Sequence, residues 1–239
     1  MANEVKKTKK SKRQLTQNDK LNGLRAAVLG ANDGVVSTAG LIFGVAGATN
    51  NKAAIFTAGL AGLIAGALSM GVGEYISVST QRDTERAYIA REKKLLAVDP
   101  EGQLHDLAEA FVVKGVSRPT ALQFARELTA KDPIKAHLET ELKLNEEDLT
   151  NPMTAAVSSL LSFTAGALVP LLAAVFSPDH LRIAITLIAV VIGLFLTGYY
   201  SAKVGGASRR KAVLRVIVGG VAAMVITYAV GRAFGAAVM

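Results

Sequence analysis

Long apolar segments, separated by short polar turns and by one long charged stretch, dominate the hydropathy pattern of the chain. Five such segments cover residues 24–48, 53–78, 154–176, 181–202 and 212–235. At about 1.5 Å per helical residue, segments of this length reach across the roughly 30 Å hydrocarbon core of a bilayer. The pattern predicts an all-α integral membrane protein with five transmembrane helices and a small helical cytoplasmic domain.

The charged stretch, residues 79–151, carries most of the 19 Asp and Glu residues of the chain. We expect the second apolar helix to continue into it as far as Asp99, because the residue before a proline disfavours helix. Three shorter helices are predicted beyond that point. The first ends near Gly115, the second begins near Pro119, and the third is capped by Asp132. This stretch is therefore predicted to fold as a domain rather than a linker.

Lys and Arg gather in residues 1–23, predicted to be a disordered basic arm, and around the last turn of the chain. The second group comprises Lys203, Arg209, Arg210, Lys211 and Arg215. The positive-inside rule therefore places the N-terminus and the insert in the cytoplasm and the C-terminus outside the cell membrane. The predicted order is the arm (1–23), two spans (24–78), the insert (79–151) and three spans (152–239). This topology explains the net charge of +8 without nucleic acid.

Composition removes several classes of function. The chain has no cysteine, which excludes thiolate metal sites, disulfides and thiol redox chemistry. All three His residues lie outside the apolar segments, so an intramembrane hydrolase would lack paired catalytic groups, and we predict that the protein is not an enzyme. Glycine pairs at small-xxx-small spacing, Gly40/Gly44 and Gly62/Gly66, allow close helix approach within one chain or between two.

Only two acidic residues, Asp33 and Glu74, fall within the apolar segments. Asp33 lies about 13 Å from the start of the first segment, where an ionisable group costs at least about 2.5 to 3.5 kcal/mol. Such a residue marks a functional site by default. An alternative, compatible with the first, is that Asn32-Asp33-Gly34 forms a helix break. Together with Pro170, this break could expose backbone carbonyls to a cavity.

Met70 and Glu74 are one helical turn apart in the second segment, so they share a face. If the first two spans pack together, Glu74, Met70 and Asp33 form a column leading inward from the cytoplasm. Carboxylates suit hard or borderline divalent ions, and a thioether favours ferrous iron over magnesium or calcium. Ordinary apolar packing is the alternative for Met70. The column predicts a pathway on which Asp33 holds either a metal ion or a proton.

Several short motifs around these positions resemble the vacuolar iron transporter family. They are Asn32-Asp33-Gly34 with Val35-Val36-Ser37-Thr38, Ser69-Met70, Gly73-Glu74-Tyr75, Ser77-Val78-Ser79, Gln81-Arg82-Asp83, Ser162-Phe163, Gly166-Ala167 and Pro170-Leu171. The resemblance extends over residues 22–235. It implies a homodimer that exchanges ferrous iron, and often manganese, for protons, with no permanently bound cofactor. It also implies that Asp33 and Met70 line the pathway and that Glu74 guards its inner mouth.

The resemblance further implies that the insert is a cytoplasmic metal-binding domain, although its ligand pattern departs from that of the family. Acidic residues stand at three of the family's ligand positions: Glu92, Asp106 and Glu141. At other positions the expected acids and methionines are replaced by Leu95, Gln103, His137 and Leu138. Because fewer carboxylates remain, we expect the insert to bind metal less completely than the family's usual version.

Two charged helix faces offer further ligands. One is the i, i+4, i+8 stripe of Glu101, His105 and Glu109, and the other is the pair of His137 and Glu141. A solvated charged face is the alternative for both. If the insert bound ions while the spans moved none, the protein would be a membrane-anchored metal sensor or buffer. That alternative to a transporter stays open.

Overall fold

The computed structural model describes residues 17–142 and 151–238, and all of its regular elements are helices. In chain order they are α1 (Gln17–Ala48), α2 (Lys52–Val98), α3 (Pro100–Val112), α4 (Arg118–Lys131), α5 (Pro133–His137), the π-helical turn η1 (Leu138–Leu142), α6 (Pro152–Phe176), α7 (Arg182–Val204) and α8 (Arg209–Val238). Five of these, α1, α2, α6, α7 and α8, are long and apolar enough to cross a membrane. The predicted all-α membrane fold is confirmed.

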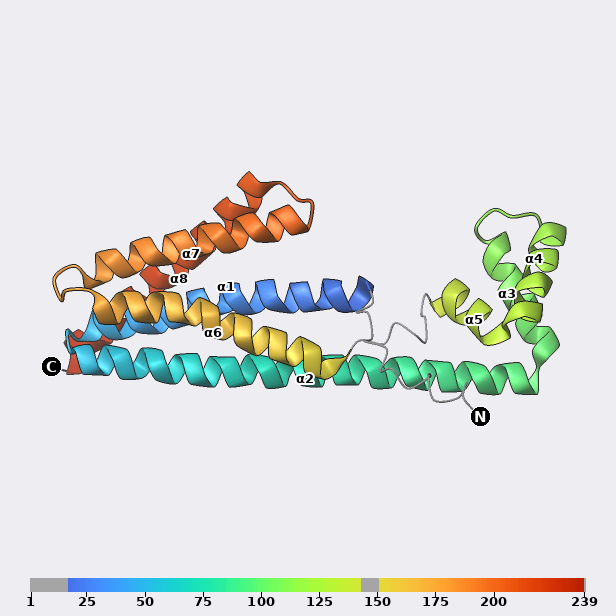
Figure 1. The fold of residues 1–239 in the computed structure, drawn as a ribbon, viewed down its shortest axis with the longest axis horizontal. Coiled ribbons are helices and arrows are strands. Elements are labelled where there is room, and N and C mark those ends of the chain that lie inside the picture. The colour runs from blue at the N-terminus through green and yellow to red at the C-terminus, as the bar shows by residue number, and fades with distance from the viewer. Residues whose placement is uncertain (1–16, 143–150, 239) are drawn as a thin grey trace, which may run out of the picture. The chain divides into compact units, whose positions relative to one another are not determined.

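The described residues form two compact units, and the boundary between them lies inside α2. We call residues 22–84 and 151–238 the bundle unit, and residues 85–142 the insert unit. Figure 1 shows the bundle helices running lengthwise and the insert helices as shorter, connected pieces. The long helix α2 continues through the boundary and ends before Asp99-Pro100, as predicted.

Helix α1 differs from its prediction at two places. It begins at Gln17, so the last residues of the predicted disordered arm are helical, whereas residues 1–16 lie outside the described part. It also continues without interruption through Asn32-Asp33-Gly34, so the predicted helix break is wrong. Gly34 serves packing instead, because a Cβ there would clash with the carbonyl oxygen of Phe163 on α6. Pro170 likewise lies inside the continuous helix α6.

Apolar residues from several long helices form one core in the bundle unit. The fully or almost fully buried members include Val35, Ala39 and Ile42 of α1, Phe163, Ala167 and Leu171 of α6, and Val190 and Leu194 of α7. The predicted glycine pairs pack within this chain. Gly40 and Gly44 lie against Thr227 of α8, and Gly66 faces the ring of Phe163. Close helix approach inside the bundle therefore accounts for these glycines.

The insert unit is built as its sequence predicts up to its last helix. Asp99 caps α3 by accepting from the backbone N–H of Gly102 at 2.9 Å, and Asp132 caps α5 by accepting from that of Lys135 at 3.0 Å. A small apolar core joins α3, α4 and α5 through Leu107, Ala108, Ala121, Ala125 and Ala136. The π-helical turn η1 directly after α5 was not predicted.

Candidate functional site

Asp33 lies on α1 within the first candidate membrane span, with its side chain partly buried. Its backbone carbonyl accepts a hydrogen bond from the Ser37 hydroxyl at 2.6 Å. Its carboxylate has no hydrogen bond or ion pair to the part of the chain that the structure describes. A carboxylate held inside a membrane span without a fixed protein partner can accept a mobile cation, either a metal ion or a proton.

Glu74 pairs with Arg25, a residue that the sequence analysis did not single out. The Arg25 Nη2 atom lies 3.5 Å from Glu74 Oε1, and the side chains are 64% and 12% exposed respectively. This contact shows which residues of α1 and α2 lie at the same level. Because the turn at residues 49–51 joins the other ends of these helices, they run antiparallel. We call the end of the bundle marked by this pair the Arg25 end.

The register orders the predicted ligands by depth. Asp33 lies eight residues beyond Arg25 on α1, about 12 Å from the Arg25 end, and Met70 lies four residues beyond Glu74 on α2, about 6 Å from it. Met70 is half-buried and packs against the bundle core. A carboxylate, a thioether and a second carboxylate therefore occupy three successive levels along these two helices, and the column that they would form stays a prediction.

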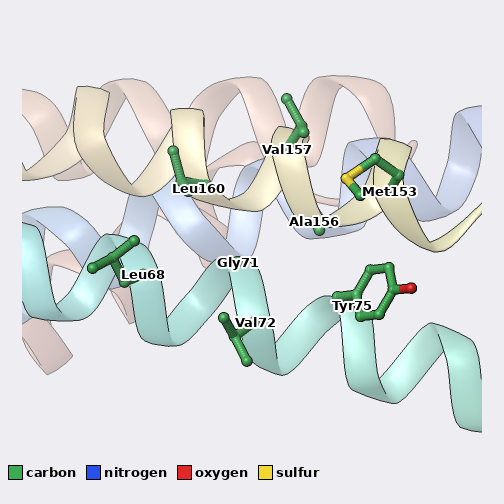
Figure 2. A pocket seen from close by; sticks show the side chains of 8 residues that line it. All are labelled: Leu68, Gly71, Val72, Tyr75, Met153, Ala156, Val157 and Leu160. Atoms are coloured by element: carbon green, nitrogen blue, oxygen red, sulfur yellow. The ribbon is translucent and has the colours of Figure 1, made fainter.

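An apolar groove of about 310 Å³ lies between α2 and α6, near the same levels. Figure 2 shows its lining side chains, which come from α2 and α6: Leu68, Gly71, Val72, Tyr75, Met153, Ala156, Val157 and Leu160. At 100° per residue, the mean direction of the groove-lining residues of α2 is about 150° from that of Met70 and about 110° from that of Glu74. The groove contains no carboxylate, so it is separate from the column of predicted ligands.

Three predicted ligands converge in the insert unit. His137 Nδ1 lies 3.2 Å from Glu92 Oε1 and 2.9 Å from Glu141 Oε1, and one ligand atom from each residue lies within 4.8 Å of the others. Glu92 comes from α2, His137 ends α5, and Glu141 lies in η1. The wider π-helical turn after His137 sets the position of Glu141, a type of distortion often found at functional sites.

Three buried ligand atoms of this cluster have no hydrogen-bond partner among the described residues. His137 is fully buried, and neither of its ring nitrogens, nor Oε1 of Glu92, has a hydrogen bond of good geometry to the described residues. Burial raises the pKa of Glu141. The nearby His137 lowers this pKa, whereas the charges of Glu92 and Asp106 raise it further. Two carboxylates and an imidazole that meet in this way form a donor set suited to a divalent transition metal.

The other predicted insert ligands do not join this cluster. Asp106 is exposed and accepts a hydrogen bond from Gln103 Nε2 at 3.4 Å. Leu95, which replaces an acid of the family pattern, is also exposed. The stripe of Glu101, His105 and Glu109 is also exposed, and Glu109 pairs with Arg118 at 3.2 Å. The exposure of these three residues agrees with the alternative interpretation of the stripe, a solvated charged face. Sequence spacing had paired His137 with Glu141, but Glu92 joins them only through the fold.

The opposite end of the bundle contains a buried arginine that the sequence analysis missed. Arg182, in the first turn of α7, is only 4% exposed. It pairs with Asp179 and donates to the backbone carbonyl of Asn50 at 3.4 Å. The i, i+3 spacing of Asp179 and Arg182 was the available signal. This arginine ties the start of α7 to the turn between α1 and α2.

The sequence is similar to known proteins over most of its length. The sequence matches the VIT family over residues 24–232. It is 39% identical over 210 residues to the vacuolar iron transporter of Acanthamoeba castellanii, covering 87% of this chain and 77% of that protein. It is 34% identical over 238 residues to vacuolar iron transporter homolog 2.1 of Arabidopsis thaliana, covering 99% and 93% respectively. The chain, a multi-pass membrane protein, therefore belongs to the VIT family.

Proposed function

We propose that this protein moves ferrous iron, manganese or both across the cell membrane in exchange for protons, in metal homeostasis or detoxification. The observation that carries the proposal is the Asp33 carboxylate, which lies in a membrane span without a partner among the described residues. The names of relatives in the family, vacuolar iron transporter among them, support iron as the substrate class.

The depth order of the ligands suggests how transport proceeds. A metal ion reaches Glu74 at the Arg25 end, exchanges part of its water for the Met70 thioether, and passes to Asp33. A thioether is a soft ligand, so it retains ferrous iron better than magnesium or calcium. At Asp33 the ion and a proton compete for the same carboxylate. Binding of one releases the other, which couples metal movement to proton movement in the opposite direction.

The insert cluster supports a second role in metal capture. Glu92, His137 and Glu141 offer three donors within a small buried volume, whereas the bundle offers one donor at each level. We infer that the insert holds metal on the cytoplasmic side and that the N-terminus shares that side, with the C-terminus outside. The same cluster favours the alternative function, a membrane-anchored metal sensor or buffer without transport. A homodimer remains part of the proposal.

Metal uptake into liposomes distinguishes these functions. The purified full-length protein is reconstituted, ferrous iron or manganese is added outside, and metal and pH are recorded inside with two separate dyes. We expect metal to enter and the internal pH to rise as protons leave. Metal binding to the protein with no flux would favour the sensor or buffer, and flux without any pH change would refute proton exchange. Chemical cross-linking in native membranes tests the homodimer.

A further inference from the structure

A second groove, of about 330 Å³, lies on the bundle surface between α1, α6 and α7. The exposed surface of its walls is almost entirely apolar, with Ala27 and Ala31 from α1, Ala165 from α6, and Leu196 and Tyr200 from α7, and the hydroxyl-bearing residues Ser162, Thr197 and Ser201 also line it. Ala165, Leu196 and Tyr200 are exposed in the described chain. The groove lies in the half of α1 nearest the Arg25 end, because Ala27 and Ala31 lie within two turns of Arg25. An apolar groove of this kind can hold an acyl chain.

Positive charge without a counterion gathers at the end of this groove. The basic residues around the turn between α7 and α8 are all exposed: Lys203, Arg209, Arg210, Lys211 and Arg215. No Asp or Glu follows Asp179 in the sequence, and none of these five residues forms an ion pair with the described residues. The local field is therefore strongly positive, which favours an anionic ligand.

Contacts connect the groove to these cations. Lys203 lies three residues after the groove residue Tyr200, on the same face of α7. Arg209 lies 5.1 Å from the ring centre of Tyr199, and its Nη1 donates to the Tyr199 hydroxyl at 3.3 Å. The rings of Tyr199 and Tyr200 are in edge contact at 5.6 Å. The apolar groove thus ends at a surface of cationic and aromatic side chains.

From this continuity we propose that the groove and the basic turn form one binding site for an anionic phospholipid of the surrounding bilayer. One acyl chain lies along Ala31, Ala165 and Leu196, and the phosphate is bound by Lys203 and Arg209. Tyr199 positions Arg209, and Tyr200 lies at the headgroup level, where aromatic rings are favoured. A symmetric contact with a second copy at this groove would bring two acid-free basic turns together, so charge favours the lipid.

Native mass spectrometry of the full chain in a neutral detergent tests this site. Phosphatidylglycerol and phosphatidylcholine with identical acyl chains are added separately, and lipid adducts are counted. We expect phosphatidylglycerol to bind more tightly. The double variant Lys203→Gln, Arg209→Gln should weaken it by about fivefold for each cation removed, since each near-surface cation contributes about 1 kcal/mol. Phosphatidylcholine binding should change little. Inorganic phosphate should not displace the lipid, because it cannot fill the apolar groove.

Matched variants separate the site from general effects. The double variant Lys52→Gln, Arg232→Gln removes the same amount of charge at the end of the bundle opposite the Arg25 end. It should leave phosphatidylglycerol binding unchanged. Ala165→Leu fills the groove and should reduce binding of the lipid, whereas Ala229→Leu, at an exposed position on α8, should not. Thermal melting confirms that each variant folds. Equal binding of both lipids, equal loss in the control pair, or a dimer whose Ala165→Leu variant dissociates would overturn the proposal.

Discussion

The bundle unit and the insert unit both hold carboxylates in sheltered surroundings, but they arrange them differently. In the bundle, Glu74, Met70 and Asp33 lie at successive depths, about 6 Å apart, and Asp33 has no partner among the described residues. In the insert, ligand atoms of Glu92, His137 and Glu141 lie within 4.8 Å of one another. One unit has its predicted ligands at separate levels, and the other brings its predicted ligands together at one place.

Of these two arrangements, the first suits the passage of an ion and the second suits its retention. Conduction requires sites that bind strongly enough to admit an ion and weakly enough to release it, which favours few ligands at each of several levels. Retention requires several ligands on one ion at the same time. The proposed transport and the proposed metal capture can be tested separately in this chain, because the two predicted ligand sets share no residue. The following predictions test them, from the largest expected effect to the smallest.

Asp33→Asn should reduce metal uptake below detection while the protein still inserts in the membrane. The amide carries no negative charge and exchanges no proton, so it can hold neither of the competing ions. Uptake and internal pH in the liposome assay measure the loss. Asp83→Asn, an exposed acid on α2, is the control and should transport normally. Wild-type rates in the Asp33 variant would remove this carboxylate from the pathway.

Glu92→Gln should weaken manganese binding by the insert by at least about tenfold, without changing the rate of transport at saturating metal. The glutamine keeps the shape of the side chain but loses the anionic oxygen that the cluster supplies. Calorimetric titration of the full chain carrying Asp33→Asn isolates the insert signal. Glu101→Gln, in the exposed stripe, is the matched control. If both variants bound metal equally, the buried cluster would not be the site.

Met70→Leu should reduce ferrous iron uptake several-fold and manganese uptake less. Leucine fills the same space, so the difference between the two ions reports the loss of the sulfur ligand rather than a packing defect. Competition between the two metals in one liposome sample gives the selectivity directly. An equal reduction for both ions would instead show that Met70 contributes only to the core.

Arg25→Gln should lower the KM for metal by up to about fivefold, because an exposed ion pair of this kind contributes at most about 1 kcal/mol. The arriving ion would no longer displace a guanidinium from Glu74. Glu74→Gln should raise KM, and the double variant should resemble Glu74→Gln alone. Initial uptake rates over a range of metal concentrations measure these shifts. A higher KM in Arg25→Gln would contradict this order of events.

Glu141→Gln should slightly stabilise the metal-free insert at neutral pH. Burial raises the pKa of Glu141, so the stability that this group contributes is present at low pH and is lost as the pH rises through the raised pKa. Hydrogen exchange of α5 and η1, compared between variant and wild type at the same pH, measures the difference. It should shrink as the pH falls. A difference that grew on acidification would reverse the assigned direction.

Much of the fold was readable from the sequence because membrane spans and helix caps are local signals. Apolar length determined the five spans, and Asp99 and Asp132 marked the starts of α3 and α5. The scarcity of acids in the apolar segments identified Asp33 and Glu74. The wrong helix break at Asn32-Asp33-Gly34 shows the limit of such signals. These turn-forming residues are helical, and Gly34 allows the close contact between α1 and α6.

Tertiary structure alone decided which distant residues meet. Spacing along one helix paired His137 with Glu141, but only the fold of the insert brings in Glu92 from α2 and leaves Asp106 outside. The Arg25 contact to Glu74 likewise depends on the register of two helices, which apolar patterns do not specify. The physical reason is that the hydrophobic effect is non-directional. It determines which segments are buried, whereas side-chain packing determines which polar groups converge.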